Sequence, residues 1–91
     1  MNQLKRPILI EIFTSPVCSR CQRTLEAVRE YVQQYPHPVK VEERDVLSHL
    51  PQATRLGVYA TPAIVINGKL VYRGPISRQQ LWRFLEETIQ D

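Results

Sequence analysis

The sequence predicts an α/β fold in which three helices flank a mixed four-stranded sheet. Three observations support this prediction. A β-branched apolar run near the start is followed by an amphipathic stretch of helical period and a second strand-like run, the pattern of a βαβ unit. An Asn-Gly pair later joins two more strand-like runs, and a capped amphipathic stretch follows them. The expected order is β-α-β-α-β-β-α, with a right-handed parallel crossover first and an antiparallel hairpin later.

The first strand is expected over residues 8–13, whose nearly continuous apolar side chains suit a strand covered on both faces. Pro16 stops the strand from continuing, because proline cannot donate a hydrogen bond to a central sheet ladder. A helix is then expected over about residues 19–35, as far as Pro36-His37-Pro38. Its apolar stripe consists of Cys21, Leu25, Val28 and Val32.

The next two elements are a polar strand and a short helix. The strand is expected over residues 39–46, and its polarity places it near a sheet edge. The helix is expected over residues 48–56, with Ser48 as its N-cap and Pro51 in its first turn. Gly57 is well placed to end it.

The last three elements are a hairpin and a helix. Asn67-Gly68 is the turn between strands expected over residues 63–66 and 69–73. Gly74-Pro75 then turns the chain, and Ser77 with Gln80 forms a capping box. The apolar stripe of the helix that follows consists of Leu81, Phe84, Leu85 and Ile89.

Length and composition exclude several classes of protein. The 91 residues, 43% of them hydrophobic, indicate a single folded domain over 1–91. No apolar run approaches about 18 residues, so we expect no membrane span. Residues 1–6 show no secretory leader, so we expect a cytoplasmic protein. The net charge of +3 is small and its nine arginines are dispersed, which argues against a nucleic-acid partner.

The segment most informative about chemistry is Cys18-Ser19-Arg20-Cys21. Two cysteines at this spacing can close a small disulfide ring or chelate one metal, and their place after a strand and at a helix start favours a redox dithiol. The helix N-terminus and the positive charges of Arg20 and Arg23 favour the thiolate form of Cys18. Cys21 lies on the apolar stripe and should be buried. We therefore expect Cys18 to attack a substrate disulfide and Cys21 to resolve the mixed disulfide.

A second unusual feature is Thr61-Pro62, just before an expected strand. Proline at a strand start marks a special backbone position, although an ordinary trans proline in a loop is equally compatible with the residues alone.

Taken together, these motifs resemble the thioredoxin superfamily over nearly the whole chain. The resemblance rests on Cys-x-x-Cys at a helix start, on Thr61-Pro62 and on Gly74-Pro75-Ile76-Ser77 before the last helix. It implies a minimal thioredoxin fold with strand order 2-1-3-4, the first and last helices on one face and the short helix on the other. It also implies that Pro62 is cis beside the dithiol and that the backbone of Thr61 receives an extended substrate.

The chain departs from the main branches of that superfamily. Val17 takes the place of the thioredoxin tryptophan, next to the substrate, and Ser19-Arg20 replaces Gly-Pro between the cysteines. Glutaredoxins typically have Pro-Tyr there and a Gly-Gly-acid sequence where this chain has Arg73-Gly74-Pro75. Because the middle pair tunes the redox potential, we expect a value between roughly −270 and −180 mV.

Glu11 is the remaining candidate for a chemical role. Thioredoxin has a buried acid on this strand that shuttles the proton of the resolving cysteine, six residues before the first cysteine. Glu11 lies seven residues before Cys18. Either the loop absorbs the extra residue and Glu11 acts as the shuttle, or Glu11 points elsewhere and is merely partnered.

We therefore expect a thiol–disulfide oxidoreductase without a bound cofactor or metal. It would be a monomer that acts on disulfide-containing proteins and receives electrons from a separate reductase. The alternatives are a glutathione-dependent glutaredoxin, with or without an iron–sulfur cluster between two subunits, and a metal-carrying or partner-binding module that uses the same cysteines. His37 and His49 are too far apart in sequence for a zinc finger.

Overall fold

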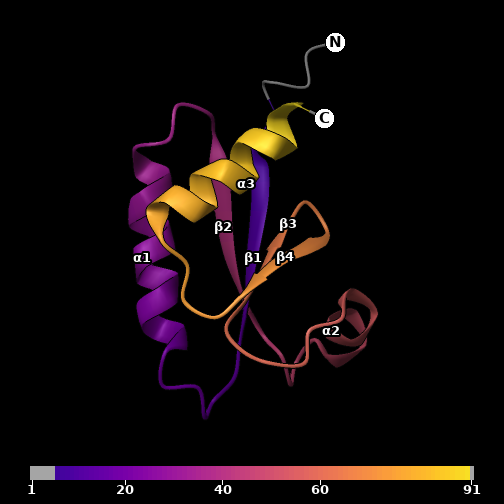
Figure 1. The fold of residues 1–91 in the computed structure, drawn as a ribbon. Helices are drawn as coiled ribbons and strands as arrows, with labels where there is room; N and C mark the ends of the chain where they lie inside the picture. The colour runs from indigo at the N-terminus through magenta and orange to yellow at the C-terminus, as the bar shows by residue number, and fades with distance from the viewer. Residues whose placement is uncertain (1–5, 91) are drawn as a thin grey trace.

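The computed structural model describes residues 6–90 and has the expected order of elements (Figure 1). Residues 1–5 and 91 lie outside the described residues, and with them most of the segment on which the expectation of no secretory leader rests. The elements are β1 (Ile8–Thr14), α1 (Cys21–Gln33), β2 (Val39–Asp45), α2 (Leu50–Leu56), β3 (Ala63–Ile66), β4 (Lys69–Arg73) and α3 (Arg78–Gln90). Over residues 6–90, no helix has the length and apolarity needed to cross a bilayer.

The sheet has the order β2-β1-β3-β4, which confirms the predicted topology. β1 pairs with β2 in parallel and with β3 antiparallel, and β3 pairs antiparallel with β4. At the carboxyl end of β1, Thr14 lies opposite Asp45 and Phe13 lies opposite Ala63. The loops that follow β1 and β2, and the loop that precedes β3, therefore meet at the same end of the sheet, the carboxyl end of β1.

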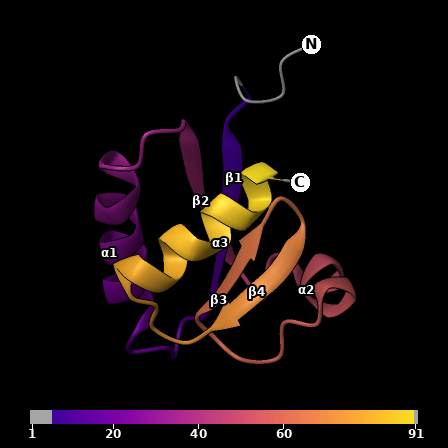
Figure 2. The same cartoon turned by 45° about the horizontal axis from the view of Figure 1, so that its top comes forward.

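The helices cover the two faces of the sheet as expected. α1 and α3 lie on one face, and α2 lies apart from them over the other (Figure 2). Side chains alternate along β1, so Ile10 and Ile12 pack towards α1 and α3, whereas Phe13 packs towards α2. β1 is thus covered on both faces, which explains its continuous apolar run.

Trp82 connects α3 to α1 through a hydrogen bond and to Tyr35, just after α1, through an aromatic contact. It lies off the apolar stripe of α3, and its indole N–H donates to the carbonyl oxygen of Tyr31 at 3.2 Å. The Tyr35 ring packs edge-on against it, with the ring centroids 5.1 Å apart. Trp82 therefore contributes to the packing of two helices against each other.

The starts of two helices differ from the sequence-based expectations. α1 begins at Cys21 rather than near residue 19, so Cys18 lies in the turn before the helix. Ser48 is not the N-cap of α2, which begins at Leu50 with His49 as its N-cap. The Ser48 backbone N–H and hydroxyl both bond to the Asp45 carboxylate, at 3.2 and 3.0 Å. Ser48 therefore stabilises the turn that follows β2, a role that sequence alone does not distinguish from a helix cap.

Two other end signals are confirmed. Gly57 ends α2 in the left-handed region at φ 82°. The Ser77 hydroxyl accepts from the Gln80 N–H, and the Gln80 side chain accepts from the Ser77 N–H, which is the predicted capping box.

The hairpin turn between β3 and β4 also anchors β1. Asn67 and Gly68 both have positive φ, 48° and 82°, as a two-residue hairpin requires. The Asn67 side-chain oxygen accepts from the Leu9 N–H at 2.9 Å, and the Asn67 N–H donates to the Leu9 carbonyl at 2.9 Å. Asn67 thus serves the turn and the central strand together.

We predict that Asn67→Ala lowers the free energy of unfolding by about 1–3 kcal/mol, because it removes a hydrogen bond and places a side chain with no local polar partner at positive φ. Asn67→Gly loses the bond without the steric cost, so its loss should be about 1 kcal/mol. Urea denaturation of both variants measures the difference. Equal losses would show that backbone strain makes no contribution at this turn.

Candidate active site

Cys18 and Cys21 form a disulfide at the carboxyl end of β1. The loop after β1 folds back in a tight turn, in which the Cys18 N–H donates to the Ser15 carbonyl at 3.2 Å. A second turn follows, in which the Cys21 N–H donates to the Cys18 carbonyl at 3.4 Å. These turns bring the two Cα atoms to 5.5 Å, within the usual range for a disulfide.

The two sulfurs have different surroundings. Cys21 is the first residue of α1 and is 4% exposed, whereas Cys18 lies in the preceding turn and is only half-buried. A reagent that approaches from solvent therefore meets Cys18 first. The later start of α1 does not remove Cys18 from the helix end, since it lies within one turn of Cys21.

The Thr61-Pro62 peptide bond is cis, as the resemblance implied. Pro62 is buried just before β3, and its carbonyl oxygen accepts from the Gly74 N–H at 2.7 Å. The Thr61 and Ser15 hydroxyl oxygens lie 3.3 Å apart, within hydrogen-bond distance. This contact joins the cysteine loop to the proline loop across 46 positions of sequence. Ser15 was missed in the sequence because nothing local indicates that partner.

A shallow depression of about 310 Å³ gathers most of the predicted site residues. It is lined by Ser15, Val17, Cys18, Ser19, Arg20 and Thr61. Val17 stands beside Cys18 and is 93% exposed. The accessible sulfur of Cys18, the positive charge of Arg20 and the apolar side chain of Val17 thus share one small surface, and Cys21 is not part of its lining.

Three further apolar side chains are exposed on segments near the end of the sheet that holds the cysteines. Leu47 follows β2, Leu50 begins α2, and Tyr59 precedes Thr61. Their exposed fractions are 66%, 53% and 79%. The sequence analysis did not select these residues. They lie in short segments around α2 and belong to no apolar helix stripe, and this pattern is the signal that could have identified them.

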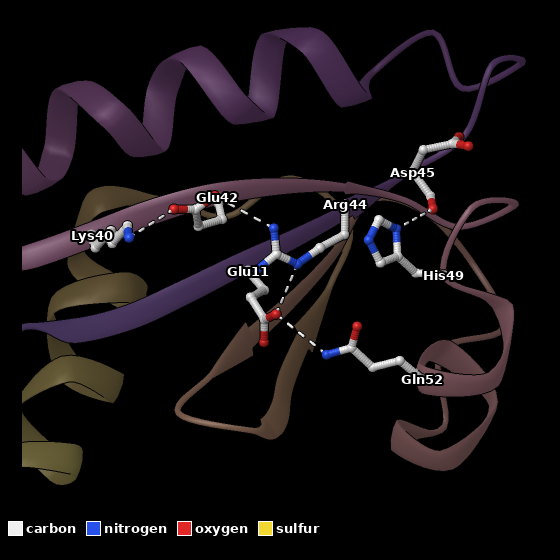
Figure 3. Close-up of polar contacts among 7 residues, drawn as sticks. All are labelled: Glu11, Lys40, Glu42, Arg44, Asp45, His49 and Gln52. Carbon is white, nitrogen blue, oxygen red and sulfur yellow. Dashed lines mark hydrogen bonds and ion pairs between the residues drawn. The ribbon is translucent and has the colours of Figure 1, made fainter.

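Glu11 lies on the other face of the sheet from α1 (Figure 3). It is 6% exposed, and one carboxylate oxygen, Oε2, accepts from Arg44 Nε at 3.0 Å and from Gln52 Nε2 at 3.3 Å. Of the two possibilities left open by the sequence, a partnered Glu11 is the arrangement observed. Its predicted role in proton transfer stays a prediction.

His37 and His49 lie at opposite ends of β2, since one precedes the strand and the other follows it. His49 Nδ1 lies 3.1 Å from the Asp45 carbonyl oxygen, and His37 Nδ1 lies 3.0 Å from that of Pro38. In the described part of the chain, no three or more His, Cys, Asp or Glu side chains are grouped so that they could hold a metal ion. The two histidines are thus not brought to the cysteines.

Comparison with known proteins is consistent with this geometry. The family model described as "Thioredoxin domain" matches residues 8–86. The chain is 35% identical over 82 residues to a protein named "Thioredoxin" from Methanocaldococcus jannaschii, covering 90% of this chain and 96% of that one. It is 33% identical over 81 residues to a "Probable Thioredoxin" from Methanothermobacter thermautotrophicus, covering 89% and 95% respectively.

Solved structures show the same fold at lower identity. A mutant thioredoxin from Halobacterium salinarum aligns with a TM-score of 0.73 at 22% identity, over 92% of this chain and 76% of that one. The first thioredoxin domain of mouse protein disulfide-isomerase A4 aligns with a TM-score of 0.71 at 20% identity, over 91% and 64%. The matched family model and the two archaeal relatives show that the chain belongs to the thioredoxin family, and together with the Cys18–Cys21 pair they support a thioredoxin-like redox function.

Proposed function

We propose that this protein reduces or exchanges the disulfides of protein substrates by dithiol–disulfide exchange, with Cys18 as the nucleophile and Cys21 as the resolving thiol. One observation carries the proposal: a disulfide joins an accessible cysteine to a buried one, in a depression that Thr61 also lines. An accessible sulfur can be reached by a second protein. A buried one is protected from outside disulfides and reacts best with its neighbour.

In the reaction, the reduced enzyme enters with two thiols. The Cys18 thiolate attacks one sulfur of the substrate disulfide, so a Cys18–substrate bond forms and the other substrate sulfur leaves as a thiolate that takes up a proton. Cys21 loses its proton and attacks Cys18, which releases the second substrate thiol and forms the Cys18–Cys21 disulfide. Two electrons pass to the substrate, and a separate reductase returns them in the reducing cytoplasm.

A polypeptide substrate fits the surroundings of Cys18. The residue before the cis proline, Thr61, offers backbone groups to an extended strand, and Val17 and Tyr59 supply exposed apolar surface. Such surface costs solvation free energy in the free protein and is covered when an apolar segment binds. The enzyme would act as a monomer without a bound cofactor.

Ser19 and Arg20 are the residues proposed to set the redox potential. Arg20 is the N-cap of α1 and lines the depression with Cys18, so its charge favours the Cys18 thiolate. The thiolate exists only in the reduced form. A charge that stabilises it therefore makes the disulfide more oxidising.

We predict that Cys21→Ser accumulates mixed disulfides with substrate proteins, because Cys18 still attacks but nothing resolves the adduct. Turnover should fall to background. Non-reducing electrophoresis and mass spectrometry of the adduct locate the bond at Cys18, and Cys18→Ser is the matched control that should trap nothing. Adducts in Cys18→Ser alone would reverse the assignment of the two sulfurs.

Arg20→Ala should lower the redox potential by roughly 5–20 mV, the size expected of an exposed charge interaction. Equilibration of the disulfide with a glutathione buffer measures the shift, which should shrink at high salt because exposed charges are screened. Arg29→Ala removes another exposed charge nine residues further along the chain, on α1, and should leave the potential unchanged. An equal or higher potential in Arg20→Ala would contradict the role of Arg20.

Tyr59→Ser should raise KM for a disulfide-bonded polypeptide roughly 3- to 30-fold, because apolar contact area is lost on binding. The rate with a small aromatic disulfide should stay unchanged, since so small a substrate does not extend beyond the depression. The paired assays use one variant and two substrates, so a folding defect would lower both rates. An unchanged KM for the polypeptide would remove Tyr59 from the docking surface.

A further inference from the structure

Glu11 is a buried charge on the central strand. β1 is otherwise apolar over residues 8–13, and a carboxylate in such a place costs free energy unless its partners compensate. Both observed donors converge on the single oxygen Oε2 (Figure 3). Among the described residues, no buried side-chain polar atom lacks a hydrogen-bond partner. Glu11 is therefore a satisfied group within a defined polar network.

One donor, Arg44, pairs with two carboxylates, those of Glu11 and Glu42. It projects from β2, beside β1, and its side chain is 25% exposed. Its second contact is Nη1 to Glu42 Oε1 at 3.4 Å, and Glu42 in turn pairs with Lys40 at 3.2 Å. The hydrogen bond from the Lys40 ammonium lowers the pKa of Glu42. Glu42 is therefore charged near neutral pH and attracts the Arg44 guanidinium.

The other donor, Gln52, belongs to the short helix α2. α2 is seven residues long, too short to be stable through its own hydrogen bonds. Ala53 is its one fully buried residue and packs with Phe13, Val58 and Val65, and the partly buried Leu56 packs against the same cluster. The bond from Gln52 to Glu11 therefore joins the first turn of α2 directly to the central strand.

The position of α2 sets the position of the proline loop. Its C-terminal turn closes at Gly57, and the Val58 N–H donates to the Ala53 carbonyl at 2.8 Å. Val58 is buried, and only Tyr59 and Ala60 separate it from Thr61. A shift of α2 on the sheet would pass through this short segment to Thr61 and to its contact with Ser15.

We propose that Glu11 is a positioning residue for substrate binding, which acts by seating α2 through Gln52 and so placing Thr61 beside Cys18. The proposal rests on the proposed function, because Thr61 matters only where a substrate strand binds there. Glu11 acts on the far face of the sheet from α1 and needs no change of protonation for this role.

The test compares four variants. Glu11→Ala and Gln52→Ala each remove the bond to α2, whereas Glu11→Gln keeps a carbonyl oxygen that accepts from both donors but cannot titrate. Thr54→Ala is the matched control, because Thr54 is exposed on the same helix. Amide hydrogen exchange over residues 57–61 reports the seating of α2 without any need for activity. Steady-state assays with a disulfide-bonded polypeptide give KM and kcat as functions of pH.

We expect Glu11→Ala and Gln52→Ala to speed exchange over residues 57–61 and to raise KM roughly 3- to 10-fold, the equivalent of one hydrogen bond, with little change in kcat. Glu11→Gln and Thr54→Ala should match the wild-type protein in exchange, KM and pH profile. Gln52→Ala leaves the charge pair of Glu11 intact, so it remains informative if Glu11→Ala fails to fold.

Two results would overturn the proposal. Wild-type exchange and KM in Gln52→Ala would show that α2 does not depend on the bond. A loss of kcat with an altered pH profile in Glu11→Gln would assign Glu11 to proton transfer instead. If the wild-type protein itself reduced no disulfide, the proposed function and the role in substrate binding would both fall, while the exchange data would still decide whether Glu11 seats α2.

Discussion

The hydrogen bonding of β1 along both of its edges decides where the chemistry of this protein takes place. Its parallel register with β2 sets Thr14 opposite Asp45, and its antiparallel register with β3 sets Phe13 opposite Ala63. Three connecting segments therefore meet at one end of the sheet. One holds the cysteines, one leads into α2 and one holds the cis proline. A one-residue slip of β1 would turn Ile10 and Ile12 away from α1 and α3 and would separate these segments, so core packing and site assembly depend on the same register.

Burying the Glu11 carboxylate costs solvation free energy, but it gives α2 a hydrogen bond to the central strand. An apolar residue at this position, between Val65 of β3 and Glu42 of β2, would itself need no hydrogen-bond partner. It would also leave the Arg44 side chain without its closer partner and Gln52 without an acceptor on β1. The polar network thus adds a specific hydrogen bond to the apolar contacts that α2 makes through Ala53 and Leu56. Specificity of placement, rather than net stability, is the benefit expected from such buried polar groups.

Local signals in the sequence were sufficient for the framework. The β-branched runs, the Asn-Gly turn and the Ser77–Gln80 capping box each act within a few residues, and each was found where predicted. One wrong prediction is local, because Ser48 bonds to Asp45, three residues before it, instead of capping a helix. Other contacts join distant segments: Ser15 meets Thr61 from 46 positions away, and Glu11 meets Gln52 from 41 positions away. These partners are chosen by the tertiary arrangement, and no local pattern distinguishes them from the alternatives.

The cysteine pair depends on local contacts, whereas the proposed recognition surface depends on contacts between distant segments. The disulfide joins residues three apart, and two turns within residues 15–21 shape its loop, so its formation depends little on distant parts of the chain. The proposed substrate-binding surface is assembled from separate segments, and we expect it to depend on the sheet register, on the position of α2 and on the contact between Ser15 and Thr61. Changes in distant segments can therefore alter which substrates bind while the Cys18–Cys21 pair keeps its geometry. A short chain with a local redox centre leaves its loops free to specialise, which is consistent with an unusual Ser19-Arg20 pair and an exposed Val17 on an otherwise regular fold.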